Sequence, residues 1–142
     1  MKTYMAHDKD VVRKWYVVDA ANKPLGRVAA KAASILRGKT KATFAANQNM
    51  GDYVVIINAA KAVVTGGKEQ KKIYYNHTGF VGGLKEYTYE TLLGKHPEEP
   101  MYRAVTGMLP GGRLGRALAD NVKIYAGAEH PHAAQNPQPI EL

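Results

Sequence analysis

A few side chains in this sequence have types and spacings that could support metal binding or nucleophilic catalysis. His130 and His132 form an H-x-H pair, but the chain has no cysteine and the one acid beside the pair is Glu129. The single serine, Ser34, falls inside an expected helix, whereas a catalytic serine is normally presented at a sharp turn. We therefore expect surface or base-stacking roles for the two histidines, no bound metal and no serine nucleophile.

The acidic residues and the loop after the first expected strand are the candidates for acid–base and nucleotide chemistry. Glu98 and Glu99 are adjacent, so on a helix they point to different faces, and they suit a helix N-terminus better than a catalytic pair. Asp19, followed by Leu25-Gly26-Arg27, superficially resembles a nucleotide-binding strand, loop and helix. The glycine fingerprints of dinucleotide and P-loop sites are absent. No catalytic residue or cofactor is predicted, and a nucleotide-dependent enzyme is kept as the alternative hypothesis.

The strongest compositional signal is positive charge. The chain has 142 residues, a size typical of one domain, and its 20 Lys and Arg against 12 Asp and Glu give a net charge of +8. This balance favours a polyanionic partner, which could be nucleic acid, an anionic membrane surface or an acidic protein. The longest apolar stretch, residues 54–57, is far too short to span a membrane, and residues 1–10 do not resemble a secretory signal. We expect a soluble, cytoplasmic protein.

The elements that would position these residues alternate between strand and helix. An aromatic and β-branched run predicts a strand over residues 15–20, and helical periodicity follows from Leu25 to Leu36, with Gly38 as its stop. Residues 53–58 are continuously apolar except at their ends, as in a central strand buried on both faces. Such alternation predicts an α/β fold with a mainly parallel sheet.

The rest of the chain has weaker signals. A single domain is expected over residues 1–142, with an N-terminal arm at 1–14 and an extended tail at 127–142. The other predicted elements are strands at 63–65, 71–76 and 122–125, a loop at 79–83, and helices at 88–94, 97–108 (with Pro97 in its first position) and 113–119.

Basic residues gather on one face of the first helix. Arg27, Lys31 and Arg37 lie opposite its apolar face, and residues 23–41 contain six basic residues and no acid. A solvated helix face would also be basic, but such faces commonly carry Glu partners one turn away. The unneutralised face therefore fits a phosphate-facing role at least as well as a solvated one.

Further basic residues lie near glycine-rich turns, where exposed amides can also bind phosphates. Clusters dispersed over several loops suit the backbone and shape recognition of A-form RNA better than a single DNA-reading helix. The residues favour RNA binding among the polyanionic partners. The candidate contacts are Arg27, Lys31, Arg37, Lys39, Lys41, Lys68, Lys71, Lys72, His77, Arg113, Arg116, Lys123, His130 and His132.

Several blocks of residues, in order along the chain, resemble one family. They are Trp15 to Ala20, Leu25-Gly26-Arg27, Gly51-Asp52-Tyr53, Tyr74-Tyr75 through His77-Thr78-Gly79, Gly107-Met108-Leu109-Pro110, Leu114-Gly115-Arg116, Val122 to Gly127, Glu129-His130 and His132 to Gln135. With these blocks the chain resembles the universal large-subunit ribosomal protein family numbered thirteen, from residue 15 to the tail and at bacterial length.

The resemblance implies a three-layer α/β/α sandwich around a mostly parallel four-stranded sheet. It also implies a non-enzymatic protein of the cytoplasmic ribosome, in the large (50S) subunit. The implied partners are large-subunit (23S) ribosomal RNA and neighbouring ribosomal proteins, with an early role in subunit assembly and a secondary role in binding and repressing messenger RNA. Thr106, Glu69 and residues 119–121 depart from a usually basic pattern. We therefore rely on Arg113, Arg116 and Lys123 as contacts in that region.

Overall fold

The first strand, first helix and second strand form as the sequence predicts. In the computed structural model, which describes residue 5 and residues 7–141, β1 spans Trp15–Asp19, α1 spans Leu25–Arg37 and β2 spans Tyr53–Ile57. Gly38 ends α1 with a φ of 79°, a left-handed conformation that glycine adopts without steric cost. The predicted arm at 1–14 lies partly outside the described residues, and its described part contains a short 3-10 helix, η1 (Asp8–Asp10).

Four strands form one parallel sheet in the order β5-β2-β1-β6, where β5 is Val122–Ile124 and β6 is Gln138–Pro139. Each pairing is parallel, with Val18 opposite Ile56 and Ile56 opposite Ile124. The predicted α/β class with a four-stranded sheet is thus confirmed. Val54, Val55 and Ile56 are all 0% exposed, as expected of a central strand with both faces covered.

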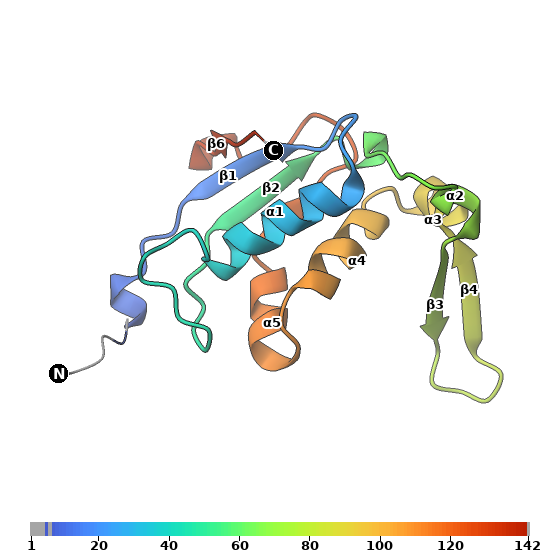
Figure 1. The fold of residues 1–142 in the computed structure, drawn as a ribbon, viewed down its shortest axis with the longest axis horizontal. Coiled ribbons are helices and arrows are strands. Elements are labelled where there is room, and N and C mark those ends of the chain that lie inside the picture. Colours follow the sequence, from blue (N-terminus) through green and yellow to red (C-terminus); the bar gives the residue numbers. More distant parts are fainter. Residues whose placement is uncertain (1–4, 6, 142) are drawn as a thin grey trace.

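Helices cover one face of this sheet. α1 lies against it and packs on α4 (Glu99–Met108) and α5 (Gly112–Ala119) (Figure 1). Val28 and Ile35 of α1 meet Val18 of the sheet and Met101 of α4 in a single buried cluster. Each such fully buried side chain contributes roughly 1.5–3 kcal/mol, so this layer fixes the position of α1.

The C-terminal tail covers the opposite face. Trp15 alternates with the core-facing residues of β1, and its ring contacts Tyr53 at 4.5 Å and His132 at 5.0 Å between centroids. Beyond a 3-10 helix, η3 (Ala133–Gln135), the tail adds β6 beside β1. The extended tail predicted from residue 127 is therefore an integral layer, and it supplies an edge strand that the sequence did not reveal.

A hairpin projects from the body of the molecule. It consists of β3 (Ile73–His77) and β4 (Leu84–Thr88), which pair antiparallel, and it stands apart from the sheet in Figure 1. The sequence predicted a strand at 71–76, but Lys71 ends a short helix, α2 (Lys68–Lys71), and β4 was missed. The predicted strand at 63–65 is a single bridge between Val63 and Pro24.

The late helices form where expected, with shifted starts. α3 spans Tyr89–Lys95, and the Thr88 side chain caps it by accepting a hydrogen bond from the Thr91 N–H at 3.3 Å. Pro97 was expected at the first position of the next helix, but it lies in the preceding turn, and Pro100 occupies the first turn instead. One more 3-10 helix, η2 (Ala59–Lys61), follows β2.

Candidate nucleic-acid interface

The basic face of α1 is exposed as predicted. Arg27 and Lys31 are exposed, lie one helical turn apart, and have no acidic residue in the first turn beside them. A cation near a helix N-terminus is unfavourable for the helix dipole, so Arg27 does not serve helix stability. The pair offers two positive charges, unpaired among the described residues, at about the spacing of one helical turn, which suits contacts with an anionic backbone.

The basic residues after α1 have different environments. Lys39 is exposed, whereas Arg37 is half-buried with its guanidinium 5.8 Å from the ring centroid of Phe44. Lys41 has three acceptors within the protein, namely the Asp52 carboxylate at 2.7 Å and the carbonyls of Val12 and Met50. An ammonium has three donors, so the fold uses all those of Lys41. We retain Arg37 and Lys39 as candidate contacts and assign Lys41 to the fold.

A second basic cluster lies around α2 and the base of the hairpin. Lys68, Lys71 and Lys72 are all exposed, and the preceding Gly66 and Gly67 have φ of 73° and 67°. These left-handed conformations favour glycine and let the chain turn tightly into α2. The turn thus presents three lysines within one helical turn.

His77 lies at the end of β3 and is exposed. Its Nδ1 accepts a hydrogen bond from the Gly79 N–H at 2.9 Å. The neutral ring therefore carries its proton on Nε2, which faces outward as a donor. This arrangement suits contact with a phosphate or a base edge.

A third basic cluster belongs to α5. Arg113 and Arg116 are both exposed, while Leu118 on the other side of the helix is fully buried. The notable glycine is Gly115, because a Cβ there would overlap the carbonyl oxygen of Pro110. Glycines beside these arginines predicted a close approach of the backbone to phosphates, but the structure gives Gly115 an internal packing reason.

The tail histidines and Lys123 are half-buried. His132 Nε2 hydrogen-bonds the Tyr125 hydroxyl at 2.8 Å, and its backbone N–H donates to His130 Nδ1 at 3.2 Å. Burial, with smaller effects from the charges of His130 and Lys123, lowers the pKa of His132 below its ordinary value. These contacts attach the tail to the sheet, and no group of three or more metal-ligating side chains occurs within the described part of the chain.

Few of the basic side chains are neutralised inside the protein. Among the described residues there are two ion pairs, Lys41 with Asp52 and Arg103 with Glu99. The exposed basic residues on α1, α2 and α5 therefore face solvent with their charge intact. No helix in this part of the chain is both long and apolar enough to cross a membrane.

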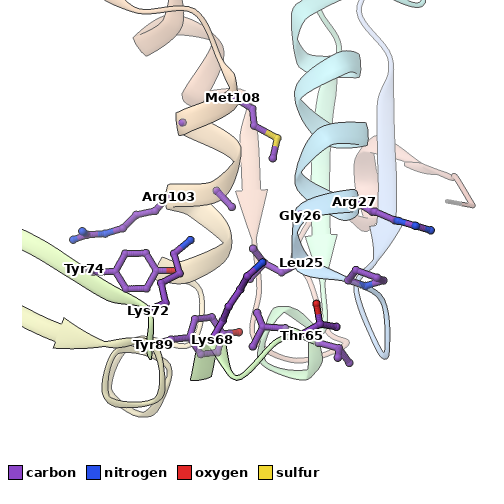
Figure 2. A pocket seen from close by; sticks show the side chains of 15 residues that line it. Leu25, Gly26, Arg27, Thr65, Lys68, Lys72, Tyr74, Tyr89, Arg103 and Met108 are labelled. Atoms are coloured by element: carbon purple, nitrogen blue, oxygen red, sulfur yellow. The ribbon is translucent and has the colours of Figure 1, made fainter. Parts of the chain in front are cut away.

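Sequence reasoning missed residues that share a cavity with Lys68 and Lys72. Arg103 on α4, Tyr74 on β3 and Tyr89 on α3 line this cavity together with the two lysines (Figure 2). The available signal was the recurrence of tyrosine two residues after lysine, as in Lys72 with Tyr74 and Lys85 with Tyr87. Local sequence does not show that α3 and α4 bring these side chains to the start of α1.

Comparison with known proteins gives consistent matches along the chain. The sequence matches the family model described as ribosomal protein L13 over residues 13–131. The large ribosomal subunit protein uL13 of Treponema denticola is 57% identical over 142 residues, covering 100% of both chains. Proteins of the same name from Treponema pallidum (strain Nichols) and Symbiobacterium thermophilum are each 53% identical and are covered over 99% of both chains.

Proposed function

The chain belongs to the ribosomal protein L13 family and is a structural, non-enzymatic constituent of the large subunit of the cytoplasmic ribosome, and we propose that it binds large-subunit ribosomal RNA directly. The observation that carries this proposal is the set of unpaired cations on three separate elements. Arg27 and Lys31 on α1, the lysines of α2, and the arginines of α5 have no ion-pair partner among the described residues.

The dispersed arrangement suits the shape of folded RNA. A-form helices are recognised through backbone phosphates and 2′-hydroxyls, so several separate contacts can together grip a composite surface. Each contact is sequence-independent, and its strength falls as salt rises because counterions are released on binding. Such binding would fit an early role in subunit assembly, in which the protein holds RNA segments together. Messenger RNA would use the same chemistry, and no described residue favours it over ribosomal RNA.

Neighbouring ribosomal proteins are the second proposed class of partner. The hairpin tip exposes Phe80 and Val81, which are 78% and 108% exposed. Large apolar side chains together at a projecting tip are typical of a contact site. We propose that this tip contacts another component of the subunit.

The direct test is incorporation into large subunits. A variant with Arg113→Glu and Arg116→Glu should co-sediment poorly with large subunits from a lysate while keeping the melting temperature of the parent chain. Lys85→Glu with Lys95→Glu makes the same charge change at other exposed positions and should incorporate normally. Normal incorporation of the α5 variant would refute this assignment of the contact.

A further inference from the structure

A cavity of about 520 Å³ lies where the segments that follow β1 and β2 meet the hairpin base and α4. Its walls include residues 24–27 at the start of α1 and residues 63–65 after β2. The carboxyl ends of parallel strands are where open α/β sheets bind ligands, and this volume falls within the usual range for ligand sites.

The polar groups of this cavity are mostly donors. Figure 2 shows the amines of Lys68 and Lys72 and the hydroxyls of Tyr74 and Thr65 directed toward its interior. The guanidinium groups of the flanking arginines extend away on either side. Arg103 is also paired with Glu99 at 2.8 Å, whereas Lys68 and Lys72 have no carboxylate partner among the described residues. The Lys72 ammonium lies 5.2 Å from the centroid of the Tyr74 ring.

The N-terminus of α1 adds backbone donors. Pro24 occupies the cap position and has no side chain that can accept a hydrogen bond from the helix. The Leu25 N–H donates to Val63, but the Gly26 N–H has no partner among the residues that the structure describes. α1 has 13 residues, so its dipole favours an anion at this position.

A buried hydroxyl gives an independent indication of a ligand. Tyr89 is 2% exposed, its Oη is directed toward the cavity in Figure 2, and this atom has no hydrogen-bond partner within the described part of the chain. Burial, then Tyr74 and Glu69, raise the pKa of Tyr89, so the hydroxyl keeps its proton. A buried donor without an acceptor is costly, and an oxyanion would supply the acceptor.

We propose that this cavity binds one phosphate group, held by Lys68, Lys72 and the Tyr89 hydroxyl, with the N-terminus of α1 adding a favourable potential from the facing wall. Bound oxygens reach Tyr89 by displacing the flexible Lys68 side chain that lies beside it (Figure 2). The inference rests on the proposed RNA binding for the source of the phosphate, which is a nucleotide of ribosomal RNA. A free nucleotide carries the same chemistry, and the apolar wall that includes Met108 can accept its base or sugar.

The test measures amide shifts in the isotope-labelled full chain by NMR at constant ionic strength. Inorganic phosphate and adenosine 5′-monophosphate should shift the Gly26 and Arg27 amides saturably, and adenosine should not. Lys68→Gln with Lys72→Gln should weaken this binding at least tenfold, whereas Lys85→Gln with Lys95→Gln, an equal loss of charge elsewhere, should change it less than twofold. Tyr89→Phe should weaken it roughly tenfold, without lowering the melting temperature, because it removes a charge-assisted hydrogen bond.

Binding of purified large-subunit ribosomal RNA, measured in parallel by filter retention, separates the possible failures. Weaker RNA binding by Tyr89→Phe supports the RNA source, and saturable phosphate shifts with unchanged RNA binding support a free nucleotide. If RNA binds, the phosphate probes cause no saturable shift, and both variants bind RNA as the control does, the cavity proposal is overturned while RNA binding stands. If phosphate binds and RNA does not, the proposed function fails and the phosphate site stands.

Discussion

Lys41 and Asp52 form an ion pair with an N···O distance of 2.7 Å, in which the Asp52 side chain is 1% exposed and that of Lys41 is 21% exposed. The same carboxylate accepts the Lys14 N–H at 2.9 Å, and Lys41 also donates to the carbonyls of Val12 and Met50. The pair therefore joins the segment before β1, the loop after α1 and the start of β2. It explains why one lysine in a basic stretch serves the fold.

Replacing Asp52 with Asn should destabilise the protein by roughly 3 kcal/mol, because the Lys41 ammonium would lose its buried counter-charge. Chemical denaturation with a linear extrapolation measures this change. Asp120→Asn, at an exposed carboxylate, is the matched control and should stay within about 0.5 kcal/mol of the parent. An equally stable Asp52→Asn variant would show that the pair does not support the fold.

Gly115→Ala should destabilise the protein by about 1–3 kcal/mol, since the new methyl group would overlap the Pro110 carbonyl and force α5 to move. Gly94→Ala is the control with the opposite expected sign. Nothing lies within 4 Å of a Cβ at Gly94, which is inside α3, so alanine should stabilise by about 0.5–1 kcal/mol. Thermal unfolding of both variants tests this contrast, and equal shifts in their melting temperatures would contradict the packing argument.

Neutralising Arg27 and Lys31 together with Gln should weaken ribosomal RNA binding and reduce the slope of log affinity against log salt by about 2, one for each lost phosphate contact. Affinities measured over a series of salt concentrations give this slope. Lys41→Met loses one charge and breaks the pair with Asp52, so it is measured at a temperature at which circular dichroism shows the variant folded. It should then leave the slope unchanged, because the fold already uses the three donors of Lys41. A change of slope in Lys41→Met would return that lysine to the RNA contacts.

Stability should fall on acidification through the titration of His132. Its pKa in the folded protein is lowered from the ordinary value of 6.5, mainly by burial, so the unfolded chain binds the proton more readily. The contribution is complete above pH 6.5 and is progressively lost as the pH falls from there toward the folded pKa. Unfolding free energies at several pH values should show a smaller decrease for His132→Gln than for the parent. His96→Gln, at an exposed histidine, should keep the parental decrease.

Elements with strong periodicity or continuous apolar runs could be predicted. The apolar face of α1 and the run at β2 each specify one environment, and Gly38 specifies the end of the helix. β4 could not be predicted, because Leu84, Lys85 and Glu86 are exposed and the strand pairs with β3 alone. The residues of β4 do not alternate between buried and exposed positions, so the strand is recognised only from its pairing with β3.

The candidate site was predictable in kind but less so in detail. Charge and glycine placement identify Arg113 and Lys68 as exposed cations, and the structure agrees. The pairing of Lys41 depends on Asp52, which only the tertiary fold brings near. Likewise, Tyr89 is an ordinary core residue by sequence, and its unpartnered hydroxyl appears only once α3 is packed beside α2 and α4.

The parallel pairing of β6 with β1 has a consequence for how the protein is made. β1 is among the first elements to emerge during synthesis. Its outer edge is covered only after Gln138 and Pro139 have been synthesised, and the contact between the rings of Trp15 and His132 forms only after His132 has been synthesised. The nascent chain therefore carries an open strand edge, a feature prone to mispairing, until β6 has been translated and pairs with β1.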